Sequence, residues 1–600
     1  MELQATSITK FLGINQSATE TQLRLGEASE MTNFIITDDL KLQKMFGYEH
    51  LNAADSHPVR GMWYGSISGV SRFLFAKNGH VYEHNLYTHA DTDLGAIHDA
   101  FPTTFFVSNN TVYIMDGSEF YSWNGTGNVT VLAGYVPAVA TASPPAGGGT
   151  LLEGINYLTG KKKQRFSADG TATVFQLLET NIESVNEVTL NGVVKTPTTD
   201  YTVDLVNGTV TFVTAPAEGT NNIEITWTKT TAGYRETITK NKYYGGVYYA
   251  RHWIFGNPDH LNTRYPSGIT MAAIGDLSYW PIFTESDVGD YEITDIKVQY
   301  NKQLIFTAGD SSGASAWYST QETYTDPYSG IVTATYPISP INSKVGNVAK
   351  GQVRVIYNNP FSIWKGVYEW ASVTGVLDEK DAKWISAKIQ QGIDDIDLTQ
   401  ALTWDWAEKG QYWLCVGSKV WIYNYRARDK YNEDVWFYLE LAHSPTCFAI
   451  IGDSLCFGTE TGQIMRIDED VLTFDGQAIS AIWEMGFTDF DTEWQQKFVR
   501  EIYLSLKPMM LSHVDLSYET DRASNAKTYT ASYRLTTFAH MNFKHFSFKT
   551  NYNPQPFRFK IRARKIDYFK VILKNDGTDS VVVLSITLPF RVGGKIKGRR

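Results

Sequence analysis

Hydrophobic and polar residues alternate along residues 447–468, CFAIIGDSLCFGTETGQIMRID, and this alternation predicts strands with one buried face. The residues GTETG at 458–462 have the composition of a tight turn between two such runs. The stretch is therefore predicted to be a β-hairpin like the inner hairpin of a β-propeller blade. A single hairpin cannot bury its own apolar face, so similar units are expected elsewhere in the chain. The apolar positions are Phe448, Ile450, Leu455, Phe457, Ile464 and Ile467.

Similar units recur along the chain, roughly one in every 40–60 residues, which suits propeller blades with long loops. They lie at residues 65–85, 104–125, 296–319, 353–370 and 412–425. Their turns are rich in Asn, Gly and Asp, which tolerate the positive φ of tight hairpins. These turns are Asn78-Gly79, Asn109-Asn110, Asp116-Gly117, Asn301-Lys302, residues 309–313, Asn358-Asn359-Pro360 and Gly417-Ser418. We predict a β-propeller; the alternative is a set of unrelated antiparallel hairpins in an all-β protein.

A small separate domain is predicted between two parts of the propeller. Residues 137–154, PAVATASPPAGGGTLLEG, read as a linker because Pro, Ala and a Gly triplet do not favour a regular element. Asn191-Gly192 and Asn207-Gly208 then separate alternating apolar runs, and each pair predicts a hairpin. Five or six strands with closely spaced turns predict a small β-sandwich inserted into the propeller.

The last part of the chain, residues 476–600, is predicted to form a second β-sandwich. Its clearest strand, PFRFKIRARK at residues 556–565, places Phe557, Phe559, Ile561 and Ala563 on one face. The predicted fold is all-β: a β-propeller with an inserted small β-sandwich and a C-terminal β-sandwich. The predicted parts are an N-terminal arm (1–60), the propeller (61–140 and 233–475), the insert (148–232), and the C-terminal β-sandwich with a basic tail (476–600).

Composition agrees with this class. A chain of 600 residues is expected to form about three or four domains, or one large propeller with attachments. Aromatic residues make up 14% of it and favour strands. The three cysteines, Cys415, Cys447 and Cys456, are too few for a disulfide framework and are expected to be buried thiols. The first residues lack the apolar core of a signal peptide, and no apolar run is long enough to span a membrane.

The formal net charge of −11 would repel nucleic acid, so the basic segments are the local exceptions. The alternating row Arg558, Lys560, Arg562 and Arg564 could contact phosphate or an acidic partner, or could be the solvated face of a strand. The tail residues Lys595, Lys597, Arg599 and Arg600 could dock on a neighbouring subunit or on DNA, or could be a solubilising end.

Other candidate sites are weaker. Asp489, Asp491 and Glu493 alternate as on a strand face but lack the glycine turn of a calcium loop, so a charged edge strand is the prediction. Asp394, Asp395 and Asp397 are similar. No zinc spacing, nucleophile elbow, P-loop or dinucleotide fingerprint is present. No catalytic residue, cofactor or metal is therefore predicted.

Three stretches resemble a family of tailed-phage structural proteins, the propeller-bearing tail hub, nozzle or packaged-DNA stabilisation proteins. In the opening, residues 23–48, the matching positions are Gly26, Glu27, Met31, Asn33, Phe34, Asp38, Leu40, Gly47 and Tyr48. The family usually has a basic pair and Pro before the last Gly-Tyr, where this chain has Lys44-Met45-Phe46. Residues 249–281 resemble a propeller loop of the same proteins through Gly256, Asn257, Pro258, Leu261, Gly275, Asp276, Tyr279, Trp280 and Pro281.

The insert resembles a module common in phage tail and fibre proteins. The matching residues are Phe166, Gly170, Phe175, Val188, Leu190, Asn191, Gly192, Asp200, Tyr201, Thr202, Val210, Phe212, Ala215 and Pro216. These resemblances imply a virion protein, synthesised in the host cytoplasm and located in the phage tail. They imply a homohexameric ring below the portal and adaptor, together with other tail proteins, that passes viral DNA without specific binding. The alternatives are a carbohydrate-binding tail-tip adhesin, whose sugars would stack on aromatic rings, or a glycan-cleaving propeller enzyme.

Overall fold

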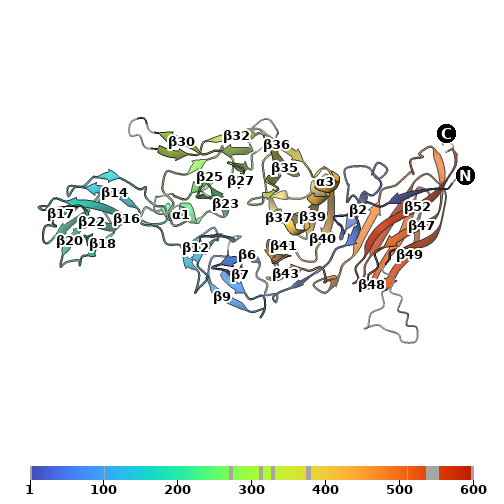
Figure 1. Cartoon of the computed structure of the whole chain (residues 1–600), viewed down its shortest axis with the longest axis horizontal. Helices are drawn as coiled ribbons and strands as arrows, with labels where there is room; N and C mark the ends of the chain where they lie inside the picture. Colours follow the sequence, from blue (N-terminus) through green and yellow to red (C-terminus); the bar gives the residue numbers. More distant parts are fainter. Residues whose placement is uncertain are drawn as a thin grey trace. The chain divides into compact units, whose positions relative to one another are not determined.

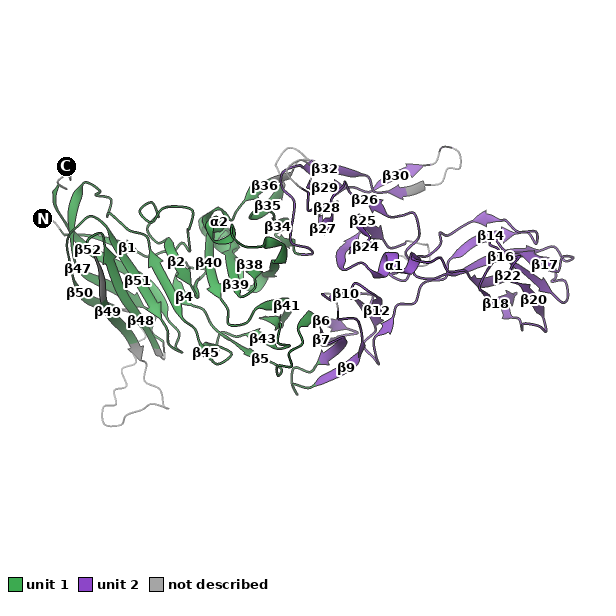
Figure 2. Cartoon of the chain, turned by 180° about the vertical axis from the view of Figure 1, so that it is seen from behind, with its two compact units in different colours: residues 1–64, 84–90, 352–600 green, residues 65–83, 91–351 purple. Residues whose placement is uncertain are grey.

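The computed structural model describes residues 3–99, 102–268, 275–309, 315–325, 327, 332–372, 380–509, 511–534 and 553–595. Strands form 54% of the chain and helices 5%, so the predicted all-β class is confirmed (Figure 1). The chain divides into two compact units: unit 1 is residues 1–64, 84–90 and 352–600, and unit 2 is residues 65–83 and 91–351 (Figure 2). In the described ranges, no helix is both long enough and apolar enough to cross a membrane.

Unit 1 contains a series of antiparallel sheets built from consecutive hairpins. One has the order β33-β34-β35-β36 and the next β37-β38-β39-β40, and a third begins β41-β42-β43. Strand β33 lies beside β37, and β37 lies beside β41, so the first strands of successive sheets are neighbours. The bounds are β33 (Arg354–Ile356), β34 (Asn359–Ile363), β35 (Val367–Ser372), β36 (Lys380–Trp384), β37 (Leu402–Trp406), β38 (Gln411–Val416), β39 (Lys419–Asn424), β40 (Val435–Glu440), β41 (Pro445–Ile451), β42 (Ser454–Thr459) and β43 (Ile464–Ile467). Short helices α2 (Gln390–Ile393) and α3 (Tyr425–Tyr431) lie between these strands.

The third sheet takes its next strand from the beginning of the chain. Strand β5 (Tyr48–His50) pairs antiparallel with β43, with Met465 opposite His50 and Ile467 opposite Tyr48. The Tyr48 side chain is fully buried and stacks on Phe474 with ring centroids 4.8 Å apart. Its hydroxyl accepts a hydrogen bond of 3.0 Å from the Ala442 backbone N–H. Strands β44 (Thr473–Phe474) and β45 (Gln477–Ala478) complete this sheet.

The stretch at residues 447–468 contains one more turn than predicted. Strands β41 and β42 are separate and reverse at Gly452-Asp453, where Gly452 has φ 61°. The predicted turn after Gly458 then connects β42 to β43. Apolar alternation continues across a two-residue turn, so periodicity alone did not separate the first two strands. Cys415 and Cys456 are buried as predicted, whereas Cys447 is only half-buried.

Most predicted hairpin turns are confirmed, including Asn78-Gly79 between β7 and β8 and Gly417-Ser418 between β38 and β39. Two turns lie one residue earlier than predicted, at Tyr300-Asn301 and Tyr357-Asn358. In both, a tyrosine takes a positive φ, of 54° and 49°. Turn rules assign that conformation to Gly, Asn or Asp, which explains the displacement.

The predicted N-terminal arm does not form a separate segment. Strand β5 belongs to the β41–β43 sheet, and the other strands of residues 1–50 belong to two sheets with strands of the C-terminal region. We call these the β47 sheet and the β48 sheet. The β47 sheet has the order β3-β4-β52-β47-β50, and β1 also pairs with β52. Its strands are β1 (Leu3–Ile8), β3 (Phe34–Ile36), β4 (Leu42–Lys44), β47 (Gln495–Leu506), β50 (Gln555–Ile566) and β52 (Val582–Lys595). The β48 sheet has the order β2-β46-β51-β48-β49, from β2 (Ala28–Thr32), β46 (Ala481–Met485), β48 (Leu511–Thr520), β49 (Ala523–Arg534) and β51 (Phe569–Asn575).

Unit 2 repeats the hairpin-built sheets. The sheet orders are β6-β7-β8-β9, β10-β11-β12-β13, β23-β24-β25-β26 and β27-β28-β29-β32. Strand β10 lies beside β23, and β23 lies beside β27. The bounds are β6 (Val59–Ile67, which begins in unit 1), β7 (Val70–Lys77), β8 (His80–His84), β9 (Asp91–Ala96), β10 (Thr104–Ser108), β11 (Thr111–Met115), β12 (Phe120–Trp123), β13 (Thr130–Val131), β23 (Tyr243–Tyr248), β24 (Arg251–Asn257), β25 (His260–Pro266), β26 (Ser286–Asp287), β27 (Ile293–Gln299), β28 (Lys302–Thr307), β29 (Ala316–Ser319) and β32 (Ile338–Asn342). Strands β30 (Glu322–Thr325) and β31 (Val332–Thr335) form a two-stranded pair, and helix α1 (Tyr234–Thr239) precedes β23.

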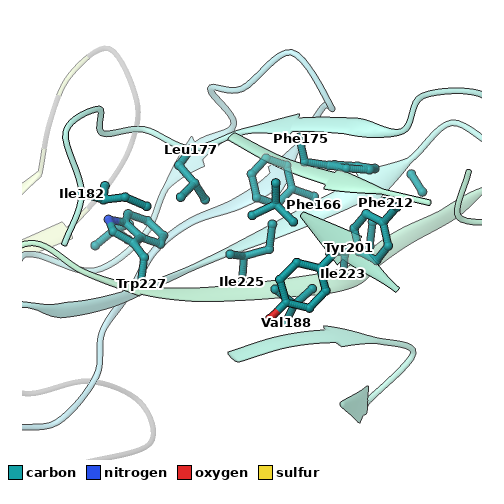
Figure 3. Close-up of a cluster of buried hydrophobic side chains, with 13 residues drawn as sticks. Phe166, Phe175, Leu177, Ile182, Val188, Tyr201, Phe212, Ile223, Ile225 and Trp227 are labelled. Carbon is teal, nitrogen blue, oxygen red and sulfur yellow. The ribbon is translucent and has the colours of Figure 1, made fainter. Parts of the chain in front are cut away.

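The insert consists of two sheets, β15-β14-β16-β22-β18-β19 and β17-β21-β20, around one apolar cluster (Figure 3). Phe166, Phe175, Tyr201, Phe212 and Trp227 lie in this cluster, together with Val139, Ala168, Leu177, Ile182, Val188, Val210, Ile223 and Ile225. The strands are β14 (Ala138–Ser143), β15 (Thr150–Leu151), β16 (Lys161–Ala168), β17 (Val174–Gln176), β18 (Ser184–Leu190), β19 (Val193–Val194), β20 (Tyr201–Asp204), β21 (Thr209–Phe212) and β22 (Gly219–Thr228).

The linker prediction for residues 137–154 is wrong over its first half. Strand β14 lies there and pairs in parallel with β16, and Ala138 and Ala140 are buried. The small alanine side chains pack closely between neighbouring strands, although a segment rich in Pro, Ala and Gly has the composition of a linker. The turn is confined to the Pro and Gly residues, where Gly147, Gly148 and Gly149 all have positive φ.

Candidate functional site

The basic row predicted at residues 558–564 lies on strand β50. Ile561, Ala563 and Ile566 are buried, and Arg558, Lys560, Arg562 and Arg564 are exposed. The alternation is therefore confirmed, with the four basic side chains on the solvent face of the strand. Among the described strands, β50 pairs with β47 alone, so it is an edge of the β47 sheet as the structure describes it.

Neighbouring strands extend this row into a basic face. Arg500 on β47 and Arg591 on β52 are also exposed. Phe498 of β47 lies opposite Arg591 on one side and opposite Arg564 on the other, which places both arginines on the same side of the sheet. We call this set the basic face: Arg500, Arg558, Lys560, Arg562, Arg564 and Arg591.

One carboxylate belongs to this surface. Glu501 forms an ion pair with Arg558 and accepts a hydrogen bond of 2.7 Å from the Tyr503 hydroxyl. The hydrogen bond from Arg558 and, to a smaller extent, that from Tyr503 lower the pKa of Glu501. Within the described ranges, the structure gives no ion pair for the other five members of the basic face.

The predicted basic tail is described only in part. Lys595 is the last residue of β52, and its ammonium group lies 5.8 Å from the ring centre of Trp494, an exposed side chain. Lys597, Arg599 and Arg600 lie outside the described residues.

The charge of the chain is strongly divided, a feature that sequence reasoning missed although counting would have found it. Residues 476–600 contain 20 Lys or Arg and 11 Asp or Glu, a formal charge of +9. Since the whole chain carries −11, residues 1–475 carry −20. The basic face therefore belongs to a segment of positive formal charge in an otherwise acidic chain.

The acidic residues at 489–493 do not form a strand, so the edge-strand prediction is wrong. They lie in a turn in which Phe490 and Asp491 both have φ 56° and the Asp489 carboxylate accepts the Asp491 N–H at 3.0 Å. Phe490 points inward and stacks on Phe590 at 4.5 Å, so its burial interrupts the expected alternation.

This acidic turn has a structural explanation. The Lys497 side chain is buried, and its Nζ donates to the Asp567 carbonyl at 3.1 Å. Burial lowers the pKa of Lys497, and the nearby charges of Asp489, Asp567, Asp521 and Glu493 oppose that shift. The carboxylates thus compensate a buried ammonium group, and no metal-ligand cluster occurs among the residues that the structure describes.

The second acidic group, Asp394, Asp395 and Asp397, lies between the end of helix α2 and the start of a 3₁₀ helix. Asp397 caps a 3₁₀ helix at residues 398–400 by accepting the Thr399 N–H at 3.0 Å. Asp394 accepts a hydrogen bond of 2.5 Å from the Gln390 side chain. Asp395 is exposed.

The opening that resembles phage proteins surrounds a buried carboxylate, Glu27. It accepts bonds from the Asn15 amide at 3.0 Å and from the Arg24 guanidinium, and it lies 3.1 Å from Lys388 Nζ. Burial alone would raise the pKa of Glu27, but the bond from Asn15 and the charge of Lys388 lower it. Gly26 has φ 96°, and a side chain there would meet the Lys10 carbonyl.

Other residues of the opening join the sheets of unit 1. Asn33 has φ 56°; its amide donates to the Ser480 carbonyl at 2.8 Å, and its side-chain oxygen accepts the Glu440 N–H at 2.9 Å. The buried Lys44 Nζ donates to Asn575 Oδ1 and to the Gly577 carbonyl, both at 2.6 Å. Burial lowers the pKa of Lys44 to about 8. These contacts give Asn33 and Lys44 of the opening a structural role in unit 1.

In the segment that resembles a propeller loop, Trp280 is buried and donates to the Leu277 carbonyl at 2.6 Å. Tyr279 donates to the Gly154 carbonyl at 3.0 Å. Asn257 is buried and caps a turn by accepting the Asp259 N–H. Residues 269–274 of this segment lie outside the described residues.

A Ser–His–Tyr arrangement in unit 2 was not predicted from sequence. His252 Nε2 lies 3.3 Å from the Ser108 hydroxyl, and Nδ1 lies 2.7 Å from the Tyr244 hydroxyl. The order resembles nucleophile, base and orienting group. Burial, however, lowers the pKa of His252 to about 4, which makes the imidazole a weak base near neutral pH. We therefore assign His252 to joining strands β10, β23 and β24.

A groove of about 430 Å³ lies beside the insert in unit 2. The exposed side chains of Leu151, Leu152 and Phe283 line it. One wall contains the Lys162–Glu179 ion pair, with a separation of 2.7 Å. The apolar residues that line this groove suit the binding of an apolar side chain.

Comparisons with known proteins give no family. No protein-family model and no curated protein matches the chain. Among solved structures, BamB from Moraxella catarrhalis has a TM-score of 0.29 and 9% identity, over 68% of this chain and 82% of that chain. Hsv2 from Kluyveromyces lactis has a TM-score of 0.28 and 7% identity, over 72% and 93%. The computationally designed Ika8 protein has a TM-score of 0.29 and 10% identity, over 70% and 99%. At these TM-scores the likenesses identify neither fold nor function.

Proposed function

We propose that the chain is a structural subunit of a phage virion tail, a hub or nozzle protein. In this role it forms a homohexameric ring that extends or closes the DNA exit channel below the portal and adaptor, and it helps to retain and then release the genome. In this proposal the hairpin-built sheets are β-propeller blades, and the insert and the β47 and β48 sheets are β-sandwiches.

The propeller interpretation is supported within each unit. Successive sheets have neighbouring first strands, as β33, β37 and β41 do in unit 1. The sheet of β41–β43 takes its next strand, β5, from the beginning of the chain. When an early strand joins a sheet of late strands in this way, it can close a circular array of sheets without leaving a free edge.

The observation that carries the functional proposal is where the resembling residues lie. Glu27, Asn33 and Tyr48 hold the opening against distant strands of unit 1. Phe166 and Phe212 lie in the core of the insert. The resemblance thus includes residues that specify this architecture.

The charge distribution also suits a channel protein. A surface formed by residues 1–475, with a formal charge of −20, would repel a DNA backbone. DNA could then pass along it without the counterion release that makes basic surfaces bind nucleic acid.

The experiment is to purify the full chain and examine it by light scattering and negative-stain imaging, alone and with a portal adaptor. Ring-shaped particles are the expected result. Mass spectrometry of purified phage particles encoding this chain should also detect it. A protein that is monomeric at every concentration and absent from the particles would refute the proposal.

A further inference from the structure

The basic face has the composition of a protein-binding surface. Five of its six basic residues are arginines, which suit interface ion pairs better than lysines do because the guanidinium is planar and weakly hydrated. Apolar side chains lie among them: Leu3 pairs with Arg591 and is 62% exposed, and Phe498 lies between Arg591 and Arg564. Arginine and aromatic residues are enriched in protein interfaces, and the centre of a nucleic-acid site is less apolar.

The face has little internal compensation. Glu501 forms an ion pair with Arg558 and its charge also acts on Lys560, which lies opposite it, while the described part of the chain provides no ion pair to Arg500, Lys560, Arg562, Arg564 or Arg591. Like charges on one sheet face repel one another. An acidic partner would relieve that repulsion, and its approach would be accelerated by the long-range field.

The same chain carries the complementary charge. Residues 1–475 have a formal charge of −20, against +9 for residues 476–600. A polyanion such as DNA would be attracted to the basic face but repelled by the rest of the molecule. A second copy carries the acidic residues that the basic face of the first copy would attract.

We propose that the basic face of one copy binds the acidic surface of residues 1–475 of a second copy, in a head-to-tail contact. The inference rests on the proposed ring-forming function and names the surface that forms the ring. A contact between two different surfaces repeats from copy to copy, and it closes into a ring when the rotation between copies permits.

The test compares R562E/R564E with the unchanged chain by sedimentation velocity at low and high salt. Both side chains are exposed, so the variant is expected to fold, which circular dichroism checks. Self-association of the unchanged chain should weaken as salt rises, because screening lengths fall from about 10 Å at 0.1 M to about 3 Å at 1 M. R562E/R564E should weaken association on the order of tenfold or more, since like-charge contacts across an interface cost several kcal/mol.

Two controls identify the cause. R562K/R564K keeps the charge and should remain within a few fold of the unchanged chain. K161E/K195E makes the same change of charge on two lysines of the insert, the exposed Lys161 and the half-buried Lys195, and should not weaken association. A ring that assembles equally well with R562E/R564E would overturn this inference and leave the proposed function intact. A chain that is monomeric under every condition would overturn both.

A DNA duplex is the remaining probe. If the unchanged chain binds the duplex, R562E/R564E does not, and self-association is the same in both, the basic face is a nucleic-acid site and the inference is wrong. If duplex competes with self-association of the unchanged chain and R562E/R564E has lost both, the two ligands share the face, and the inference is supported.

Discussion

Replacing Tyr48 by alanine should release the strand that the beginning of the chain contributes to the β41–β43 sheet. The Tyr48 ring is fully buried, stacks on Phe474 at an interplanar angle of 12°, and meets Phe457 edge-on with centroids 5.1 Å apart. The strand itself is short, with three residue pairs to β43. The Tyr48 ring is therefore the main apolar anchor of this strand.

The magnitude follows from the burial of the ring. Truncating a fully buried large aromatic residue to alanine destabilises by about 3–5 kcal/mol. Since about 1.4 kcal/mol is a factor of ten, local opening of β5 should become roughly a hundredfold to a thousandfold more frequent. Tyr48→Phe keeps the ring but removes the acceptor of the Ala442 N–H. Its effect should be about 1 kcal/mol, because Ala442 is exposed and water can replace the hydroxyl.

Hydrogen exchange measured by mass spectrometry suits this prediction, because a chain with two compact units is not expected to unfold in one step. The amide of Asp468 donates to the Gly47 carbonyl, and the amide of Asp475 donates to the Tyr48 carbonyl at 2.8 Å. Peptides containing these amides should exchange faster in Tyr48→Ala. Tyr87, which is 95% exposed, provides the control Tyr87→Ala. Equal exchange in Tyr48→Ala and the unchanged chain would refute the assignment of Tyr48 as the anchor.

Three further predictions concern residues beside this strand, in the opening and in unit 2. Gly47→Ala should destabilise the same strand, because the new Cβ would lie 1.9 Å from the Thr473 carbonyl oxygen, and the same peptides report it. Glu27→Gln should lower the urea midpoint of unit 1, because a neutral amide leaves Lys388 without its carboxylate partner, whereas Arg24 keeps its ion pair with Glu433; the exposed change Glu30→Gln should leave the midpoint unchanged. The folded-state pKa of His252 is about 4, below its usual value of 6.5, so its contribution to stability is complete above pH 6.5 and is lost as the pH falls toward 4. The pH dependence of the thermal midpoint between 4 and 6.5 should flatten in His252→Gln, and an unchanged profile would contradict the role of His252.

Local features of the fold were predictable from the sequence. Asn191-Gly192 and Asn78-Gly79 form the predicted turns because positive φ is a property of single residues and needs no distant contact. The face of β50 was predictable for the same reason, since alternation depends on neighbouring residues only.

Non-local pairing was not predictable in the same way. Nothing in the first residues indicates that Leu3 lies opposite Arg591, or that Tyr48 lies opposite Ile467. The full basic face depends on these pairings, because Arg500 and Arg591 join the row of β50 only through the order of the strands. The acidic turn was misinterpreted because its partner, the buried Lys497, is an ammonium group inside an apolar strand pattern.

The pairing of β1 with β52 sets an order of events during synthesis. A ribosome releases residues 3–8 long before residues 586–591 exist, so β1 waits for its partner through almost the whole of translation. Until then its backbone groups lack this partner, and the β3–β4 hairpin has a free edge on β4, whose other neighbour is the same late strand. A product that stops short of β52 therefore leaves β1 and the edge of β4 exposed to pairing with other chains. The assembled basic face, which includes Arg591 of β52, therefore appears only after this late strand has been synthesised.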